Sequence, residues 1–106
     1  AEKQILQPET VQQFTSRCKG CTRRGIGFDM KELDNDKTQN ISMETSERTF
    51  GHLGFTGIGA WADPNHNLIY LFLSNRTYPK WKGNNILSKN NYRPRIQSII
   101  YQSITP

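Results

Sequence analysis

The sequence has 106 residues, the length of one domain, and 34% of them belong to the apolar set AVILMFWYC. Fourteen Lys and Arg residues against nine Asp and Glu residues give a net charge of +5. The basic residues are scattered and no run is longer than Arg23-Arg24, which disfavours a specific nucleic-acid binder. No apolar run approaches the roughly 18 residues of a membrane span. The chain lacks an initiating Met and a signal-like start, so we expect a processed chain or a piece of a longer one.

The first half of the chain predicts one helix, one short strand and one long loop. Pro8 is typical of a first helical turn, and the apolar residues that follow it three apart predict a helix over residues 8–16. Alternating apolar residues predict a strand over residues 25–30. Residues 31–49 contain few large apolar groups, so we expect a long loop there, either a mobile excursion or a lid.

The second half predicts a hairpin and a helix. Residues 55–62 and 68–74 are rich in β-formers and flank a turn sequence, Asp63-Pro-Asn-His-Asn67, which predicts a β-hairpin. The second of these strands is apolar at every position from Leu68 to Leu73, which predicts a central strand with helices over both faces. Residues 77–91 are polar and turn-rich. Arg93-Pro94 then begins a helix whose apolar stripe consists of Ile96, Ile99, Ile100 and Ile104.

These elements define the expected fold class. The order helix, strand, loop, hairpin, helix predicts a single α+β domain or fragment over residues 1–106. We expect an antiparallel sheet of at least three strands, with an N-terminal and a C-terminal helix packed on it.

The two cysteines form a single Cys-x-x-Cys, Cys18-Lys-Gly-Cys21. A structural zinc site needs four ligands, and no second pair of cysteines or closely spaced histidines accompanies this one. A redox motif opens a helix after a strand, whereas this one sits among Lys, Gly and Arg. We therefore expect a loop with two thiols, with metal or disulfide chemistry as the alternative, and we expect no metal and no cofactor.

A glycine-rich segment runs from Phe50 to Trp61 and holds four glycines in and beside a predicted strand. Glycine weakens a strand interior, so several together indicate a close approach by a ligand or another backbone. The spacing is not G-x-G-x-x-G and no helix follows, which excludes a dinucleotide cradle. Small residues, a histidine and unpaired backbone N–H groups on an edge strand suit an acyl group and its oxyanion.

Several motifs follow one another in chain order: Pro8-Glu-Thr-Val11, Arg23-Arg-Gly-Ile-Gly-Phe-Asp29, Gly51-His-Leu-Gly-Phe-Thr-Gly57, Trp61-Ala-Asp-Pro64, Leu68-Ile-Tyr-Leu-Phe-Leu-Ser-Asn-Arg76 and Arg93-Pro-Arg-Ile-Gln97. Together they resemble the C-terminal portion of serine β-lactamase-related hydrolases. These are the class C β-lactamases, D,D-peptidases and esterase-like proteins of the penicillin-recognising fold. The resemblance covers nearly the whole chain, and it is strongest to the bacterial branch in which such a domain can follow a glycosidase domain.

The resemblance implies a role for the residues after Gly51. In that family a strand beside the active site bears Lys-Thr-Gly or His-Thr-Gly, and His52-Leu53-Gly54 falls there. His52 then positions substrate and moves protons, Gly54 lets substrate approach, and the backbone N–H of Phe55 is an oxyanion donor. Leu53 replaces the usual Thr, so an ester, amide or unusual peptide is at least as plausible a substrate as a penicillin. The substrate-binding positions implied are Leu53, Thr56 and Gly57.

The family's chemistry also needs a Ser-x-x-Lys nucleophile and a Tyr-x-Asn or equivalent. Ser16-Arg-Cys-Lys19 matches the first by letter, but it lies at the end of a short predicted helix and in a loop, so we discount it. No Tyr-x-Asn is present. We expect the chain to be the C-terminal wall of a serine hydrolase domain, inactive by itself. Its expected partners are the missing N-terminal part of that domain and a small-molecule, peptide or ester substrate.

The resemblance also implies an exported bacterial enzyme of the cell envelope. A piece of this kind should expose apolar sheet or helix surface, and it can associate with itself through an unpaired strand edge. The alternative is a small binding or interaction module without catalysis, for which the glycine-rich hairpin and residues 31–49 form the recognition surface.

Overall fold

The computed structural model describes residues 2–80, 82–83 and 85–104. The chain forms helix α1 (Pro8–Phe14), then strands β1 (Asp29–Met30), β2 (Phe50–Leu53), β3 (Gly59–Asp63) and β4 (Leu68–Phe72). Two helices follow, α2 (Ile86–Lys89) and α3 (Tyr92–Ile104). The strands form one antiparallel sheet in the order β1-β2-β3-β4, so the α+β class is confirmed.

The predicted hairpin is present as β3 and β4. Its turn closes where Asn67 N–H donates to the Pro64 carbonyl at 3.4 Å, and Asn67 has a φ of 50°, which asparagine tolerates better than most residues. The first strand begins later than expected, because residues 54–58 form the turn between β2 and β3. Gly54 N–H donates to the Ile58 carbonyl at 2.7 Å across that turn.

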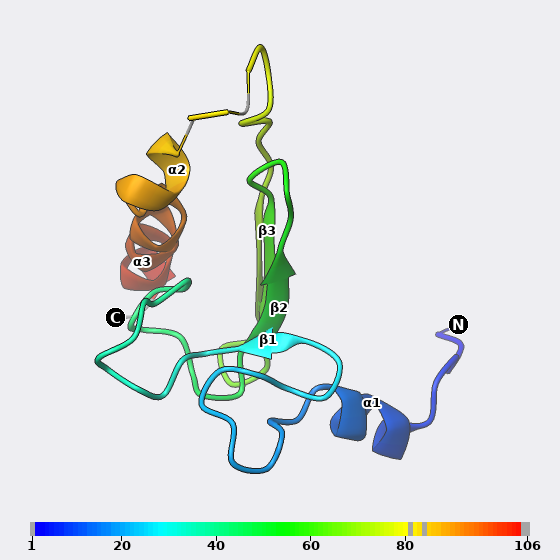
Figure 1. The fold of residues 1–106 in the computed structure, drawn as a ribbon. Helices are drawn as coiled ribbons and strands as arrows, with labels where there is room; N and C mark the ends of the chain where they lie inside the picture. The colour runs from blue at the N-terminus through cyan, green and yellow to red at the C-terminus, as the bar shows by residue number, and fades with distance from the viewer. Residues whose placement is uncertain (1, 81, 84, 105–106) are drawn as a thin grey trace.

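The helices cover only one face of the sheet. Figure 1 shows α2 and α3 together along one side, while α1 is set apart near the end where β1 lies. Trp61 and Tyr70 are directly opposite each other in the register and are buried on the helix side, where they form a cluster with Ile41. Their neighbours in the strands point the other way. We call that side the open face, with Phe50, His52, Ala60, Ala62, Ile69 and Leu71.

The prediction that Leu68 to Leu73 is a central strand covered on both faces is wrong. β4 is an edge strand, last in the sheet order. On its open side Ile69 is 71% exposed and Leu71 is 61% exposed, and Leu73, just after the strand, is 76% exposed. The strand is therefore apolar on both sides although only one side is covered within the described residues.

Three helical predictions also need correction. α1 ends at Phe14, buries none of its residues and does not pack on the sheet; its end is tied to the next loop by the bond from Gly27 N–H to the Phe14 carbonyl. α3 forms as predicted, but Ile96, Ile99 and Ile104 are exposed, and its buried residues are Gln97 and Tyr101. The range 77–91 contains α2, which was not predicted; Trp81 and Asn84 of that range lie outside the described residues.

The strand predicted over residues 25–30 is reduced to its last two residues. Gly25 N–H donates to the Phe28 carbonyl at 2.8 Å, so the segment turns back on itself before β1. Arg24 pairs with Asp29 across this turn, both as a backbone bridge and as an ion pair of their side chains. Local turn hydrogen bonds have replaced the ladder that the alternating pattern suggested.

Residues 31–49 contain no helix or strand, as expected, but they are packed rather than projecting. Ser42 N–H donates to the buried Gln97 side chain at 2.9 Å, and Ser98 donates to Glu44 at 2.6 Å, which joins the loop to α3. The Lys31 ammonium donates to two carbonyls of the loop itself, those of Met43 and Thr45. The loop is therefore part of the packed interior. Hydrogen bonds of its backbone and side chains hold it there in place of apolar contacts.

A buried carboxylate lies where the loop, the hairpin and α3 meet. Asp63 is 2% exposed and accepts hydrogen bonds from Ser46 N–H (3.0 Å), the Ser46 hydroxyl (2.6 Å), the Tyr101 hydroxyl (2.7 Å) and His66 Nδ1 (2.8 Å). We call Ser46, Asp63, His66 and Tyr101 the Asp63 cluster. Burial alone would raise the pKa of Asp63, but the donated hydrogen bonds outweigh it and hold the pKa well below its usual value.

Asp63→Asn tests this cluster, because an amide replaces one acceptor oxygen by a donor that faces other donors. We expect a loss of about 2–3 kcal/mol of unfolding free energy at neutral pH. Since the folded pKa lies below the unfolded value of 3.8, Asp63 stabilises the fold fully above that value, and the contribution is lost as the pH falls through the folded pKa.

Urea unfolding from about pH 2 to about pH 7 measures both effects. The wild type should lose more stability on acidification than Asp63→Asn does. Asp36→Asn, at an exposed loop position, is the matched control and should keep the wild-type pH dependence. Equal acid sensitivity in the wild type and Asp63→Asn would contradict the account.

Candidate functional site

His52 lies on the open face of β2, close to the free part of the strand's edge. The pairing with β1 covers Phe50 and Gly51 and stops there, so His52 and Leu53 lie beyond it. The His52 side chain is 63% exposed. Its register neighbour across β3 is Ala60, whose small side chain leaves space on the open face beside the ring. The imidazole is thus accessible to a molecule that approaches from the side without helices.

The ring of His52 has a defined orientation. Nδ1 lies 2.6 Å from the Leu53 carbonyl oxygen, and because a carbonyl only accepts, this contact places the proton on Nδ1. In the neutral ring Nε2 then carries the lone pair and can accept a proton. Nε2 is 3.8 Å from the Asp29 carboxylate, beyond hydrogen-bond distance but within range of an ion pair when the ring is protonated. The ring is therefore fixed with Nδ1 against the backbone and Nε2 beside Asp29.

This histidine has an acidic neighbour that no sequence pattern predicted. Asp29 is buried, and the Arg24 guanidinium donates to its carboxylate. The tight turn between Arg24 and Asp29 brings both to the β1–β2 edge. The only signal in the sequence was the presence of both residues in the motif Arg23-Arg-Gly-Ile-Gly-Phe-Asp29.

The turn after β2 is held from two directions. The Thr56 carbonyl accepts the backbone N–H of Arg76 at 2.9 Å, and the Gly57 carbonyl accepts Arg93 Nη1 at 3.0 Å. Arg93 belongs to α3, and its own carbonyl accepts the Tyr70 hydroxyl at 2.9 Å. The turn is therefore fixed both to the segment after β4 and to α3, although no predicted element suggested these anchors.

The other predicted site residues do not all lie beside His52. Leu53 packs against the core cluster on the helix side, so its side chain lies on the face opposite His52. Gly54 begins the turn, and a Cβ there would meet only Ile58, at 3.4 Å or more. Phe55 is exposed, with the Arg76 guanidinium 4.8 Å from its ring centre. Thr56 and Gly57 contribute their carbonyls to the anchors just described. The roles assigned to these residues remain predictions.

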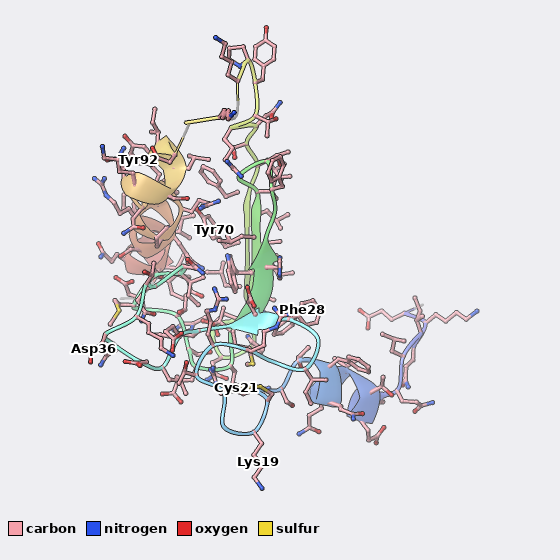
Figure 2. All side chains as sticks on the ribbon, viewed as in Figure 1. Lys19, Cys21, Phe28, Asp36, Tyr70 and Tyr92 are labelled. Atoms are coloured by element: carbon pink, nitrogen blue, oxygen red, sulfur yellow. A yellow bond between two sulfur atoms is a disulfide. The ribbon has the colours of Figure 1, made fainter. Side chains whose placement is uncertain are left out.

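The serine and lysine of the Ser-x-x-Lys letters are not brought together as a nucleophile and base. The Ser16 hydroxyl donates back to the Gln12 carbonyl in α1. Lys19 points outward at the tip of the loop beside Cys21 (Figure 2). Cys18 and Cys21 lie in a loop, as predicted, but they form a disulfide with each other. The expectation of two thiols is therefore wrong, and the disulfide alternative is correct.

Two searches of the described residues bear on ligands and membranes. No group of three or more His, Cys, Asp or Glu side chains in residues 2–80, 82–83 and 85–104 is arranged to hold a metal ion. Over the same residues, every helix is too short or too polar to cross a bilayer.

Comparison with models of known protein families, with curated proteins and with solved structures finds no match for this chain.

The two glycines of the turn give a matched test of its geometry. Gly57 has a φ of 96°, and a Cβ there would lie 2.6 Å from both Leu87 Cδ1 and Ser74 Oγ. Gly57→Ala should therefore lower the unfolding free energy by about 1–3 kcal/mol. Gly54→Ala adds the same methyl at an open position and should stay within about 0.5 kcal/mol of the wild type. Thermal or urea unfolding of both variants measures the difference. Equal losses of unfolding free energy in the two variants would show that the turn is not held as described.

Proposed function

We propose that this chain is the C-terminal part of a β-lactamase-related serine hydrolase domain, in which it forms one wall of the active site. The observation that carries the proposal is the position of His52. It is an exposed, oriented histidine at the free part of a strand edge, and after Leu53 the chain continues into Gly54 and a tight turn. This is the arrangement that the resemblance of residues 51–57 to a His-Thr-Gly strand implies.

In the proposed reaction an ester, amide or β-lactam carbonyl is attacked by a serine from the missing part of the domain. His52 contributes the proton-accepting Nε2 and a site for a hydrogen bond to the substrate. Gly54 leaves space for the substrate beside the strand, because a methyl group there would contact only Ile58. The backbone N–H of Phe55 is the proposed donor to the oxyanion.

The open face supports the proposed partner. Ile69, Leu71 and Leu73 expose large apolar groups on the same side of the molecule as His52 or next to it. Apolar patches of this kind mark surfaces that another body covers. The missing N-terminal part of the domain is the proposed cover, and it would bring the serine to the side from which His52 is accessible.

The disulfide supports an exported location. Disulfides persist in oxidising compartments such as the periplasm and the cell surface. The Cys18–Cys21 bond therefore fits the proposal of a bacterial enzyme that acts at the cell envelope.

The chain by itself should not hydrolyse ester or β-lactam substrates, because the Ser16 hydroxyl donates to the Gln12 carbonyl of α1 and Lys19 points outward. The measurement is turnover of p-nitrophenyl acetate and of a chromogenic β-lactam by the purified chain, with Ser16→Ala as the control. Turnover that Ser16→Ala abolishes would contradict the proposal.

A second experiment uses the chain joined to the coding sequence upstream in its gene. His52→Gln should lower kcat/KM by about 100-fold to 10,000-fold, the range of general acid–base catalysis. Lys19→Gln, an exposed cation away from β2, is the control and should keep the wild-type rate. Hydrolysis that is indifferent to His52→Gln, or no hydrolysis by the longer protein, would favour the binding module instead.

A further inference from the structure

β4 combines the sequence of a central strand with the position of an edge strand. Residues 68–73 are apolar without interruption, a pattern typical of strands buried on both faces. Yet β4 pairs only with β3 and is the last strand of the sheet. None of the backbone hydrogen bonds outside the sheet ladder in the described part of the chain involves residues 68–73. The outward N–H and C=O groups of β4 therefore form an open edge.

Natural edge strands usually carry features that prevent pairing with another chain. These features are charged side chains, proline, a bulge, or a helix or loop that covers the edge. Residues 68–74 contain no charged residue and no proline, and the register between β3 and β4 runs through five consecutive pairs without a bulge. The nearest charge along the chain after β4 is Arg76. Among the described residues, the edge therefore carries no charge, proline or bulge that would prevent pairing.

We propose that a second copy of this chain adds to the β4 edge, so that two four-stranded sheets become one continuous antiparallel sheet. A two-fold axis through Leu71 gives a register in which side chains of the same face meet. Ile69 then lies opposite Leu73 of the second copy on the open face, and Tyr70 lies opposite Phe72 on the helix side. The axis places α3 of both copies on the same side and makes the open faces continuous.

Two observations favour a second copy over an unlike partner. The free edge presents only backbone groups and apolar side chains, and these are matched by a strand of the same composition. The net charge of +5 on each chain opposes association, but residues 68–74 carry no charge, so the paired strands add nothing to this repulsion. An antiparallel pair about a two-fold axis also closes at a dimer, as most homo-oligomers do. This inference does not rest on the proposed function.

The test compares two lysine substitutions on the open face. Leu71→Lys places like charges directly opposite each other on the two-fold axis, which destabilises strand pairing. Ala60→Lys is the matched control, because Ala60 is the register partner of Leu71 but lies one strand in from the edge. Sedimentation velocity or light scattering measures the mass. We expect twice the 12.2 kDa of one chain for the wild type and Ala60→Lys, and a single chain for Leu71→Lys.

A charge-swap experiment separates repulsion from misfolding. Leu71→Glu alone should also be monomeric, whereas an equimolar mixture of Leu71→Lys and Leu71→Glu should restore a dimer that contains one chain of each. A monomeric wild type would overturn the proposal. So would a dimer that Ala60→Lys abolishes as completely as Leu71→Lys, because that dimer forms through the open face, and so would a mixture that stays monomeric.

Discussion

The arrangement of this protein depends on the buried carboxylate of Asp63. A carboxylate with 2% exposure is tolerated only when its oxygens are fully hydrogen-bonded, and the donors come from three separate segments. Ser46 represents the long loop, His66 the hairpin turn, and Tyr101 the C-terminal helix. Burial and the bond to Asp63 raise the pKa of Tyr101 well above its ordinary value, so Tyr101 remains a neutral donor. Satisfying one carboxylate therefore places the loop, the hairpin and α3 together.

This polar junction explains why the molecule has two unlike sides. α3 meets the sheet through the Tyr101 hydroxyl, which donates to Asp63, and through the Arg93 carbonyl, which accepts the Tyr70 hydroxyl. Its Gln97 accepts from Ser42 of the long loop, and among its isoleucines only Ile100 joins the core cluster. Most of the isoleucine stripe is consequently exposed. On the opposite side no helix packs against the described strands, and the exposed groups there include His52 and the apolar residues of β4. The open side is thus where a partner or a substrate has access.

Local signals in the sequence predicted the elements that local chemistry decides. The turn sequence from Asp63 to Asn67 located the hairpin, and Arg93-Pro94 located the start of α3 to within a residue. The burial of these elements was predicted less well, because it depends on partners far apart in sequence. The isoleucine stripe suggested the wrong buried face of α3, since the polar partners of Gln97 and Tyr101 lie 55 and 38 residues away. The sequence of β4 is typical of a central strand because it is apolar at every position, and nothing in that local pattern indicates that one of its faces is uncovered within the described residues.

The candidate site divides in the same way. The glycine-rich sequence predicted a histidine on an edge strand, but it did not predict the turn at residues 54–58, because residues 55–62 were assigned to one strand. The Arg24–Asp29 ion pair beside His52 and the hydrogen bond from Arg93 to the Gly57 carbonyl depend on how the chain folds. The spacing of these residues in the sequence did not predict them. Leu53 was assigned to substrate binding but packs against the core cluster. Successive side chains of β2 point to opposite faces of the sheet, and the preceding residue, His52, lies on the open face.

The most direct test of the proposed function is to read the coding sequence upstream of the codon for Ala1. The account predicts an open frame with Ser-x-x-Lys followed by Tyr-x-Asn or an equivalent, which would supply the nucleophile that this chain lacks. A start codon at or near Ala1 without such a frame would contradict it. The chain would then have an exposed histidine and an open apolar face but no catalytic serine, and a binding module would be the better description.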